Sequence, residues 1–445
     1  MSMRACRIAG LVLTAGTLFA SHSFAALTHQ WTKQFGTSTD DTSRDVSVGS
    51  DNRIYVGGNT KGTLGHPNAG SWDGFVRRFD ASGGISHTRQ FGTSGFEFNP
   101  GVVAEPVGGA IVVGGSHGSL YGTQVGSGDA VIANYSSTGV LLWSDQLGSS
   151  ASDLYLDVAQ GLGGNVVAVG STLGNIIGTN AGSRDVLIRK YSSTGSALWT
   201  RQFGGTSLDT GNGVAIDHVG NIYVVGQTST HLGVGGSVGE DAFVRKYSST
   251  GTEMWTRQIG GLGNEDGVAI TVRHGDVYIT GHTTGSVEGT NAGGTDMFAS
   301  KIDGTTGGVA WTKQFGTSGD DVGGAIAVDA DGHVFIHGRT GGALGGAHLG
   351  GIDAFLMELA ADGTQLWSDQ YGTIADEGGD GISLDDLGNV YVTGRTEGTV
   401  DTFGGSHLGG EDGYLRKYSG AAIPEPSVGV VMFGGVMLAC RRRKV

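Results

Sequence analysis

Two series of acidic residues are the most chemically suggestive feature of the sequence. The first series stands ten residues after the start of each copy of a repeated motif, and its members are Asp41, Glu97, Asp153, Asp209, Glu265, Asp321 and Glu377. The second series precedes an apolar run in each copy, and its members are Asp73, Asp129, Asp185, Asp241, Asp296, Asp353 and Asp412. Rings of carboxylates can bind hard cations such as calcium. Two carboxylates across a channel mouth could also act on glycosidic bonds.

The regular repetition of these acids is equally typical of a structural role. An aspartate at a turn accepts hydrogen bonds from backbone N–H groups and thereby fixes the turn. A repeated scaffold needs such a residue in every copy, whereas a unique active site does not need seven copies. We therefore favour turn fixation for both series. The sequence identifies no cofactor. Calcium bound by the first acidic series is the one cofactor that the sequence suggests.

Other patterns with catalytic or metal-binding spacing lack the context that they require. Residues 114–118 have the spacing of a nucleophile elbow around Ser116, but no helix is expected after them. The run Asp329-Ala-Asp331-Gly332 lacks the later ligands of an EF-hand and predicts a hairpin turn. Glycine-rich loops carry four histidines, of which only the last two occupy matching positions: His66, His231, His348 and His407. No serine or cysteine has a credible base partner, which favours a non-catalytic protein over an enzyme.

A repeat of 56 residues positions all of these groups. The motif Trp199-Thr-Arg-Gln-Phe-Gly204 recurs seven times, and its copies start at residues 31, 87, 143, 199, 255, 311 and 367. Six copies start with tryptophan and one starts with His87, while all seven keep glutamine and glycine at the fourth and sixth positions. Self-similarity at such a period is typical of a propeller or a solenoid.

Each repeat contains four strand-like segments separated by Gly, Ser, Asn and Asp turns. In the clearest copy they are residues 214–217, 221–226, 241–247 and 253–259. Four short strands per repeat and no helical period predict an all-β fold, a seven-bladed β-propeller over residues 27–418. A parallel β-helix is the alternative, but its coils are shorter and it needs terminal caps. We predict that the tryptophans fill the space between blades and that the glutamines, from Gln34 to Gln370, bridge neighbouring blades.

The order of the strands predicts that the N-terminal strand closes the ring. The repeat region begins with a fourth strand, residues 27–35, and ends with a third strand, residues 412–418. The first of these can complete the last blade, which removes two exposed sheet edges. Tight hairpins should lie on one face of the ring and long, glycine-rich loops on the other, where binding residues are expected. Both cysteines, Cys6 and Cys440, lie in terminal segments, so no disulfide supports the predicted monomeric ring.

The charge of the protein narrows the class of ligand. The formal net charge is −15, and the chain without its terminal segments carries 21 Lys+Arg against 41 Asp+Glu, a net charge of −20. Such a surface argues against nucleic acid as a partner and admits cations or neutral glycans.

Both termini have the composition of targeting segments. Residues 1–25 combine Arg4 and Arg7 with an apolar run and small residues at the end, which predicts a secretory signal peptide. At the other end, residues 419–426 form a linker with a Pro-Glu-Pro triplet, and residues 427–445 form an apolar stretch followed by a basic cluster. The key residues of this end are Pro424, Glu425, Pro426, Arg441, Arg442 and Arg443.

The C-terminal segment resembles the PEP-CTERM sorting signals of Gram-negative bacteria in all three parts and in their order. The resemblance implies an exosortase-type processing enzyme as a partner and transient anchoring of the C-terminal helix in the membrane. It also implies delivery to the cell envelope, the cell surface or the extracellular matrix, where exopolysaccharide is a neighbour. The basic cluster would hold the helix against the cytoplasmic leaflet.

The repeat resembles the SBBP family of seven-bladed β-propellers. The similarity rests on Gly213-Val-Ala-Ile-Asp-His-Val-Gly-Asn-Ile-Tyr-Val-Val-Gly226 and its copies, for example residues 381–394. The resemblance implies the fold but no shared reaction. We therefore expect an exported, non-catalytic binding or structural protein at the cell surface or in the extracellular matrix. The alternative is a polysaccharide-acting hydrolase or lyase on the same scaffold.

Overall fold

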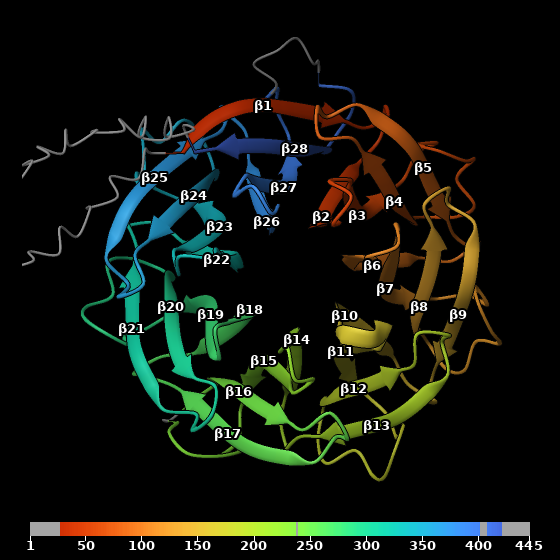
Figure 1. Ribbon diagram of the computed structural model, residues 1–445, viewed down its shortest axis with the longest axis horizontal. Coiled ribbons are helices and arrows are strands. Elements are labelled where there is room, and N and C mark those ends of the chain that lie inside the picture. Colours follow the sequence, from red (N-terminus) through yellow and green to blue (C-terminus); the bar gives the residue numbers. More distant parts are fainter. Residues whose placement is uncertain (1–26, 237–238, 401–406, 421–445) are drawn as a thin grey trace, which may run out of the picture.

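Seven four-stranded antiparallel sheets surround a central channel and form a closed ring (Figure 1). The structure is a computed structural model that describes residues 27–400, apart from 237 and 238, and residues 407–420. The innermost strand of each sheet lines the channel, and the outermost strand lies at the perimeter (Figure 1). The predicted all-β, seven-bladed propeller is therefore confirmed. The predicted signal peptide and sorting signal lie outside the described residues.

The strands fall into four concentric sets. The inner strands are β2 (Asp41–Val48), β6 (Glu97–Ala104), β10 (Asp153–Gln160), β14 (Asp209–Ile216), β18 (Glu265–Arg273), β22 (Asp321–Val328) and β26 (Glu377–Leu384). The second strands are β3 (Ile54–Thr60), β7 (Gly109–Ser116), β11 (Val166–Thr172), β15 (Ile222–Thr228), β19 (Asp276–Thr283), β23 (Val334–Thr340) and β27 (Val390–Thr396).

The outer two sets complete each blade. The third strands are β4 (Asp73–Phe79), β8 (Asp129–Ser136), β12 (Asp185–Tyr191), β16 (Asp241–Tyr247), β20 (Asp296–Asp303), β24 (Asp353–Leu359) and β28 (Asp412–Ser419). The outer strands are β1 (Thr28–Phe35), β5 (Ile85–Phe91), β9 (Leu141–Leu147), β13 (Ala197–Phe203), β17 (Glu253–Ile259), β21 (Val309–Phe315) and β25 (Gln365–Tyr371). One short 3₁₀ turn, Leu162–Gly164, follows β10.

The N-terminal strand closes the ring, as the strand order predicts. Strand β1 pairs antiparallel with β28, so the last sheet has the order β1-β28-β27-β26. Gln34 lies opposite Tyr414, and Phe35 lies opposite Gly413. Residues about 380 positions apart in the chain thus share one blade, and β28 has no free edge.

The inner strands are longer than the sequence predicts. Strand β14 begins at Asp209, five residues before the predicted start at Val214. The missed residues are Asp, Thr, Gly and Asn, which have a low preference for strands. A bulge between Gly211 and Gly213 breaks the alternation there, so period-two reasoning fails. As a result, the first acidic series begins the inner strands instead of lying in the links between blades.

Apolar clusters between neighbouring blades make up the core. Six of the seven clusters include one of the motif tryptophans, which confirms their predicted role. Trp143, for example, stacks on Tyr191 of the next blade with ring centroids 6.0 Å apart. The seventh cluster lies where His87 replaces tryptophan, and there Phe91 stacks on Tyr135 instead. Burying such large aromatic surfaces is the main stabilising contribution of each junction.

A hairpin glycine of the following blade covers six of these seven side chains, and Trp367 is the exception because no hairpin joins β28 to β1. Gly195, between β12 and β13, has φ of 83°, a conformation that favours glycine. A Cβ atom at Gly195 would lie 2.6 Å from Trp143 of the preceding blade. The repeated hairpin Ser-Ser-Thr-Gly therefore serves both the turn and the contact between blades. No helix within the described ranges is long and apolar enough to cross a membrane.

Candidate functional site

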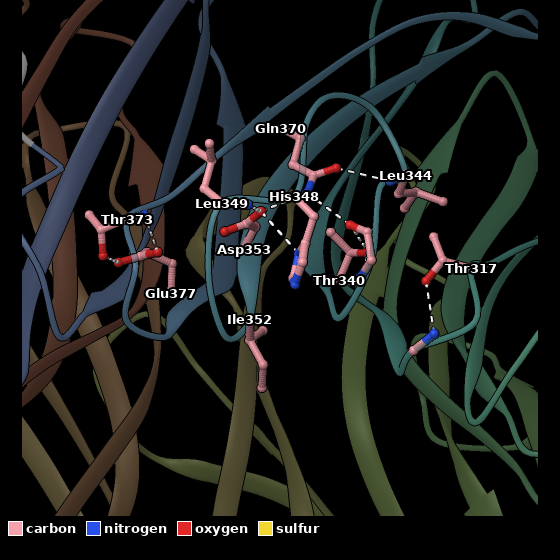
Figure 2. Close-up of polar contacts among 12 residues, drawn as sticks. Thr317, Thr340, Leu344, His348, Leu349, Ile352, Asp353, Gln370, Thr373 and Glu377 are labelled. Atoms are coloured by element: carbon pink, nitrogen blue, oxygen red, sulfur yellow. Dashed lines mark hydrogen bonds and ion pairs between the residues drawn. The ribbon is translucent and has the colours of Figure 1, made fainter.

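A polar network on the long-loop face joins the outer strands of each blade, and Figure 2 shows it in the blade of β22 to β25. In the blade of β22 to β25, the Gln370 amide donates to the Gly342 carbonyl at 2.8 Å and to Asp353 Oδ2 at 2.7 Å. The Gln370 carbonyl oxygen accepts from the Leu344 backbone N–H at 2.9 Å. All of these partners belong to the same blade. The prediction that the glutamines bridge neighbouring blades is therefore wrong, because the amide reaches past β24 to the loop of its own blade.

The first acidic series joins one blade to the next. Glu377 begins β26 and accepts hydrogen bonds from the Thr373 backbone N–H at 2.7 Å and from the Thr396 hydroxyl at 2.8 Å. Thr373 lies in the link from the preceding blade, so the carboxylate fixes that link (Figure 2). Burial is the main cause that raises the pKa of Glu377, and the nearby Asp353 charge adds to it.

The two acidic series meet at the motif glycine in four copies: Gly36, Gly92, Gly204 and Gly372. Gly372 lies between Asp353 and Glu377, and a Cβ atom at Gly372 would overlap Asp353 Oδ1 and lie 2.6 Å from Glu377 Oε2. The same overlap with the second-series aspartate occurs at Gly36, Gly92, Gly148, Gly204 and Gly316. The sixth position of the motif is glycine because a buried carboxylate occupies the space of a side chain.

These contacts support the structural role of both series. The second-series Asp353 also accepts from the Leu349 backbone N–H at 2.9 Å. Within the part of the chain that the structure describes, no group of three or more His, Cys, Asp or Glu residues is placed to hold a metal ion. Calcium at the first series stays a prediction of the sequence.

The other motifs of the sequence take part in the same network. The Ser116 hydroxyl donates to Glu97 Oε1 at 2.8 Å, the role that threonine has in other copies, so it belongs to the scaffold. Asp329 Oδ1 accepts from the backbone N–H groups of Asp331 and His333, which confirms a hairpin turn. His348 and His407 lie 3.4 Å from Asp353 and Asp412 of their own blades and do not meet at one site.

Residues that break the repeat gather around the channel mouth on the long-loop face. The penultimate residues of the second strands are Asn59, Gly115, Ser171, Gln227, His282, Arg339 and Arg395. The fourth residues of the inner strands are Arg44, Pro100, Leu156, Asn212, Val268, Gly324 and Asp380. A symmetric scaffold does not require such variety. The candidate site is this asymmetric rim, which we call the channel mouth; aligning the seven copies would have revealed it.

Charged groups of the channel mouth concentrate on three adjacent blades. Arg395 Nη1 lies 3.6 Å from Asp380 Oδ2, and Arg395 Nε lies 3.3 Å from Glu411 Oε1. Arg44 Nη1 approaches the other oxygen of Asp380 at 4.0 Å. Burial lowers the pKa of Arg44, while the charge of Asp380 opposes that change. The arrangement is an ion-pair cluster in which guanidinium groups face the mouth.

The remaining blades give the channel mouth a different chemistry. Phe96 packs edge-on against His117 at 5.6 Å, and with Phe98 and Leu154 they line an apolar hollow of about 100 Å³. Further round, the Asn212 amide donates to Asp266 Oδ1 at 2.7 Å. Burial and then the Glu240 charge raise the pKa of Asp266 to about 7. Charged, apolar and amide sectors thus follow one another around the ring.

The channel itself holds a cavity of about 430 Å³ with two acidic side chains at equivalent positions. Asp45 Oδ2 accepts from the Val102 backbone N–H of the next blade at 2.9 Å, and Asp157 Oδ2 accepts from Val214 at 2.8 Å. Both carboxylates face the channel, and both residues are partly exposed to solvent. Desolvation by the surrounding protein is nevertheless the main cause that raises the pKa of Asp45 to about 8, and the charge of Asp157 adds to it.

Asp45→Asn is expected to reduce the pH dependence of stability. Because the folded-state pKa of Asp45 lies above the ordinary value of 3.8, the folded state holds the proton more tightly than the unfolded state does. The resulting stabilisation is complete below about pH 4 and is lost as the pH rises toward 8. The unfolding free energy of the parent should fall by up to about 1 kcal/mol per pH unit in that window. Asparagine should flatten this slope.

Urea unfolding at several pH values measures the slope directly. Asp331→Asn removes an exposed carboxylate from a hairpin and should leave the parent slope unchanged. Equal slopes for the parent and for both variants would contradict the assignment of the pH dependence to Asp45.

The fold and its repeats define the class of protein, a seven-bladed β-propeller built from blades of one type. The model of the SBBP β-propeller repeat family matches residues 30–66 and 198–233. The regulatory protein FlaEY of Caulobacter vibrioides is 26% identical over 282 residues, which are 54% of this chain and 29% of FlaEY. The chain thus matches less than a third of the length of that relative.

Solved structures with similar architecture share little sequence with this chain. A Dyadobacter fermentans protein of unknown function is 11% identical with a TM-score of 0.47, over 89% of this chain and 99% of its own. The quinohemoprotein alcohol dehydrogenase of Comamonas testosteroni is also 11% identical, with a TM-score of 0.46, over 88% of this chain and 76% of its own.

Proposed function

We propose that this protein is an exported, non-catalytic β-propeller that binds glycans or other envelope components through its channel mouth. The observation that carries the proposal is the asymmetry of that rim. Charged, apolar and amide side chains replace one another at positions where the scaffold repeats. Loops and strand ends on a rigid scaffold are typical places for binding residues.

The contacts of the repeated carboxylates favour binding over hydrolysis. A glycosidase needs one carboxylate that donates a proton and a second that acts as a base or nucleophile. The first acidic series instead accepts hydrogen bonds from links between blades, as Glu377 does from Thr373. In the channel, Asp45 and Asp157 each accept from a backbone N–H of the neighbouring blade. These carboxylates are engaged in holding the ring together.

Export and sorting belong to the same proposal. The motivation is the composition of residues 1–25 and the Pro424-Glu-Pro426 and Arg441–Arg443 elements, which resemble targeting signals. Intact-mass measurement of the protein from the envelope of its native cells tests this part. We expect a chain without its first 25 or so residues and without most of the segment after Ile423. Recovery of the chain with Arg441–Lys444 attached would argue against sorting.

The test of function is incubation of the full chain with acidic and neutral polysaccharides, followed by assays of binding and of new reducing ends. We expect saturable binding without release of reducing ends. Turnover that a single carboxylate substitution abolishes would replace this proposal with a hydrolase or lyase. The regulatory description of FlaEY makes a protein partner a further candidate, so envelope extracts should be screened in parallel.

A further inference from the structure

A small pocket opens in the charged sector of the channel mouth. It has a volume of about 240 Å³ and lies among the ends of β23, β26, β27 and β28, where Arg339, Arg395, Glu397 and Glu411 line it. Typical ligand pockets begin at about 300 Å³. This pocket is therefore suited to one sugar residue or a group of similar size.

Arg339 differs from the other guanidinium groups of the sector. Arg395 is held by Asp380 and Glu411, and Arg44 approaches Asp380. Arg339 has no hydrogen bond or ion pair to any residue that the structure describes, yet it is partly buried and lines the pocket. Arg44 and Arg395 share the carboxylates of Asp380 and Glu411, so Arg339 is the guanidinium group of this sector without an ion pair among the described residues. Two arginines and four acidic residues line the pocket, and one of these acids, Glu377, already accepts hydrogen bonds from Thr373 and Thr396.

The rim of the same pocket offers hydrogen-bond acceptors. Glu397 is exposed and has no side-chain partner among the described residues, and Asp376 uses Oδ1 to accept from the Ile352 backbone N–H at 2.9 Å. Carboxylates at a rim accept hydrogen bonds from hydroxyl groups, whereas a guanidinium group binds a carboxylate in a planar, two-pronged geometry. A ligand that matches both features carries one carboxylate and several hydroxyls.

We propose that this pocket binds a carboxylate-bearing sugar residue of an acidic glycan, with the carboxylate on Arg339 and the hydroxyls on Glu397 and Asp376. The inference rests on the proposed binding function and specifies its ligand class. Arg395, fixed by its two acidic partners, provides a second positive wall. The excess of rim carboxylates limits affinity for densely charged polymers, because like charges repel.

Binding of oligogalacturonate and of its methyl ester to the full chain tests the inference, because esterification removes the carboxylate charge and adds only a methyl group. Calorimetry should show tighter binding of the acid. Arg339→Gln should weaken binding of the acid by about tenfold or more, as expected for loss of a charge-assisted hydrogen bond, and leave the ester unaffected. Arg273→Gln, which removes an exposed arginine at the end of β18 on the opposite face, should change neither.

The outcomes separate this inference from the broader function. Equal binding of acid and ester, or equal effects of Arg339→Gln and Arg273→Gln, would overturn the pocket assignment and leave glycan binding intact. Failure of both probes and of neutral polysaccharides to bind would overturn both proposals. Melting temperatures of the two variants should match the parent, since neither arginine side chain has a hydrogen bond or ion pair to a residue that the structure describes. A lower value for Arg339→Gln alone would contradict its role as an unpaired ligand-binding group.

Discussion

Deletion of residues 27–35 should lower the melting temperature sharply or cause aggregation. The deletion removes β1, the outer strand of the last blade, and leaves the edge of β28 unpaired. It also removes Phe35 and Trp31, which pack with Tyr391 in the cluster between the last blade and the first. Unpaired strand edges bind other chains, so loss of stability and aggregation are expected together.

Single substitutions separate the packing contribution of β1 from its edge pairing. Phe35→Ala should cost about 3–5 kcal/mol in the free energy of unfolding, because the side chain is 5% exposed. Gln30→Ala, at an exposed position of the same strand, should cost well under 1 kcal/mol. Differential scanning calorimetry compares these variants with the deletion. A deletion mutant that melts like the parent would disprove closure by the N-terminal strand.

The sequence predicts the outer half of each blade better than the inner half. Strands such as β16 and β17 agree with their predicted bounds, because apolar and aromatic residues form continuous or alternating runs there. The inner strands were predicted too short, because glycine and aspartate fill their first halves and a bulge breaks the alternation. Ring closure was predictable from strand order alone, since each repeat offers the same pairing.

The partners of repeated polar residues could not be predicted in the same way. A repeat gives identical surroundings to every copy, so the sequence cannot distinguish a contact within one blade from a contact with the next. Gln370 is bonded within its own blade, whereas Glu377 fixes a link between blades, although both residues recur at the same interval. Only the positions of β24 and β26 in space distinguish these roles.

The candidate site was missed for a related reason. Residues that recur in every copy are scaffold residues, because every copy must reproduce the scaffold. Arg339 and Arg395 stand directly before repeated threonines, where other copies have Asn59, Gly115 or Ser171. A position at which the copies differ in residue type was the signal that could have revealed the site. The closed ring brings these positions together at the channel mouth.

Gly148→Ala should destabilise the protein by about 3 kcal/mol, as expected for overpacking combined with disturbance of a buried hydrogen-bonded group. The new Cβ atom would overlap Asp129, whose side chain is fully buried. Asp129 cannot move aside cheaply, because its Oδ2 accepts from the Gln146 amide at 2.8 Å and from the Val125 backbone N–H at 2.9 Å. Denaturant unfolding measures the loss.

A control and a double variant identify the cause of that loss. Gly420→Ala adds a Cβ atom with no neighbour within 4 Å, so stability should stay the same or rise slightly through the unfolded state. If the Asp129 carboxylate causes the penalty, Gly148→Ala should cost much less in an Asp129→Ala background than in the parent, because contacting residues are not additive. Full additivity of the two substitutions would mean that glycine is required at this position for a reason other than the buried carboxylate.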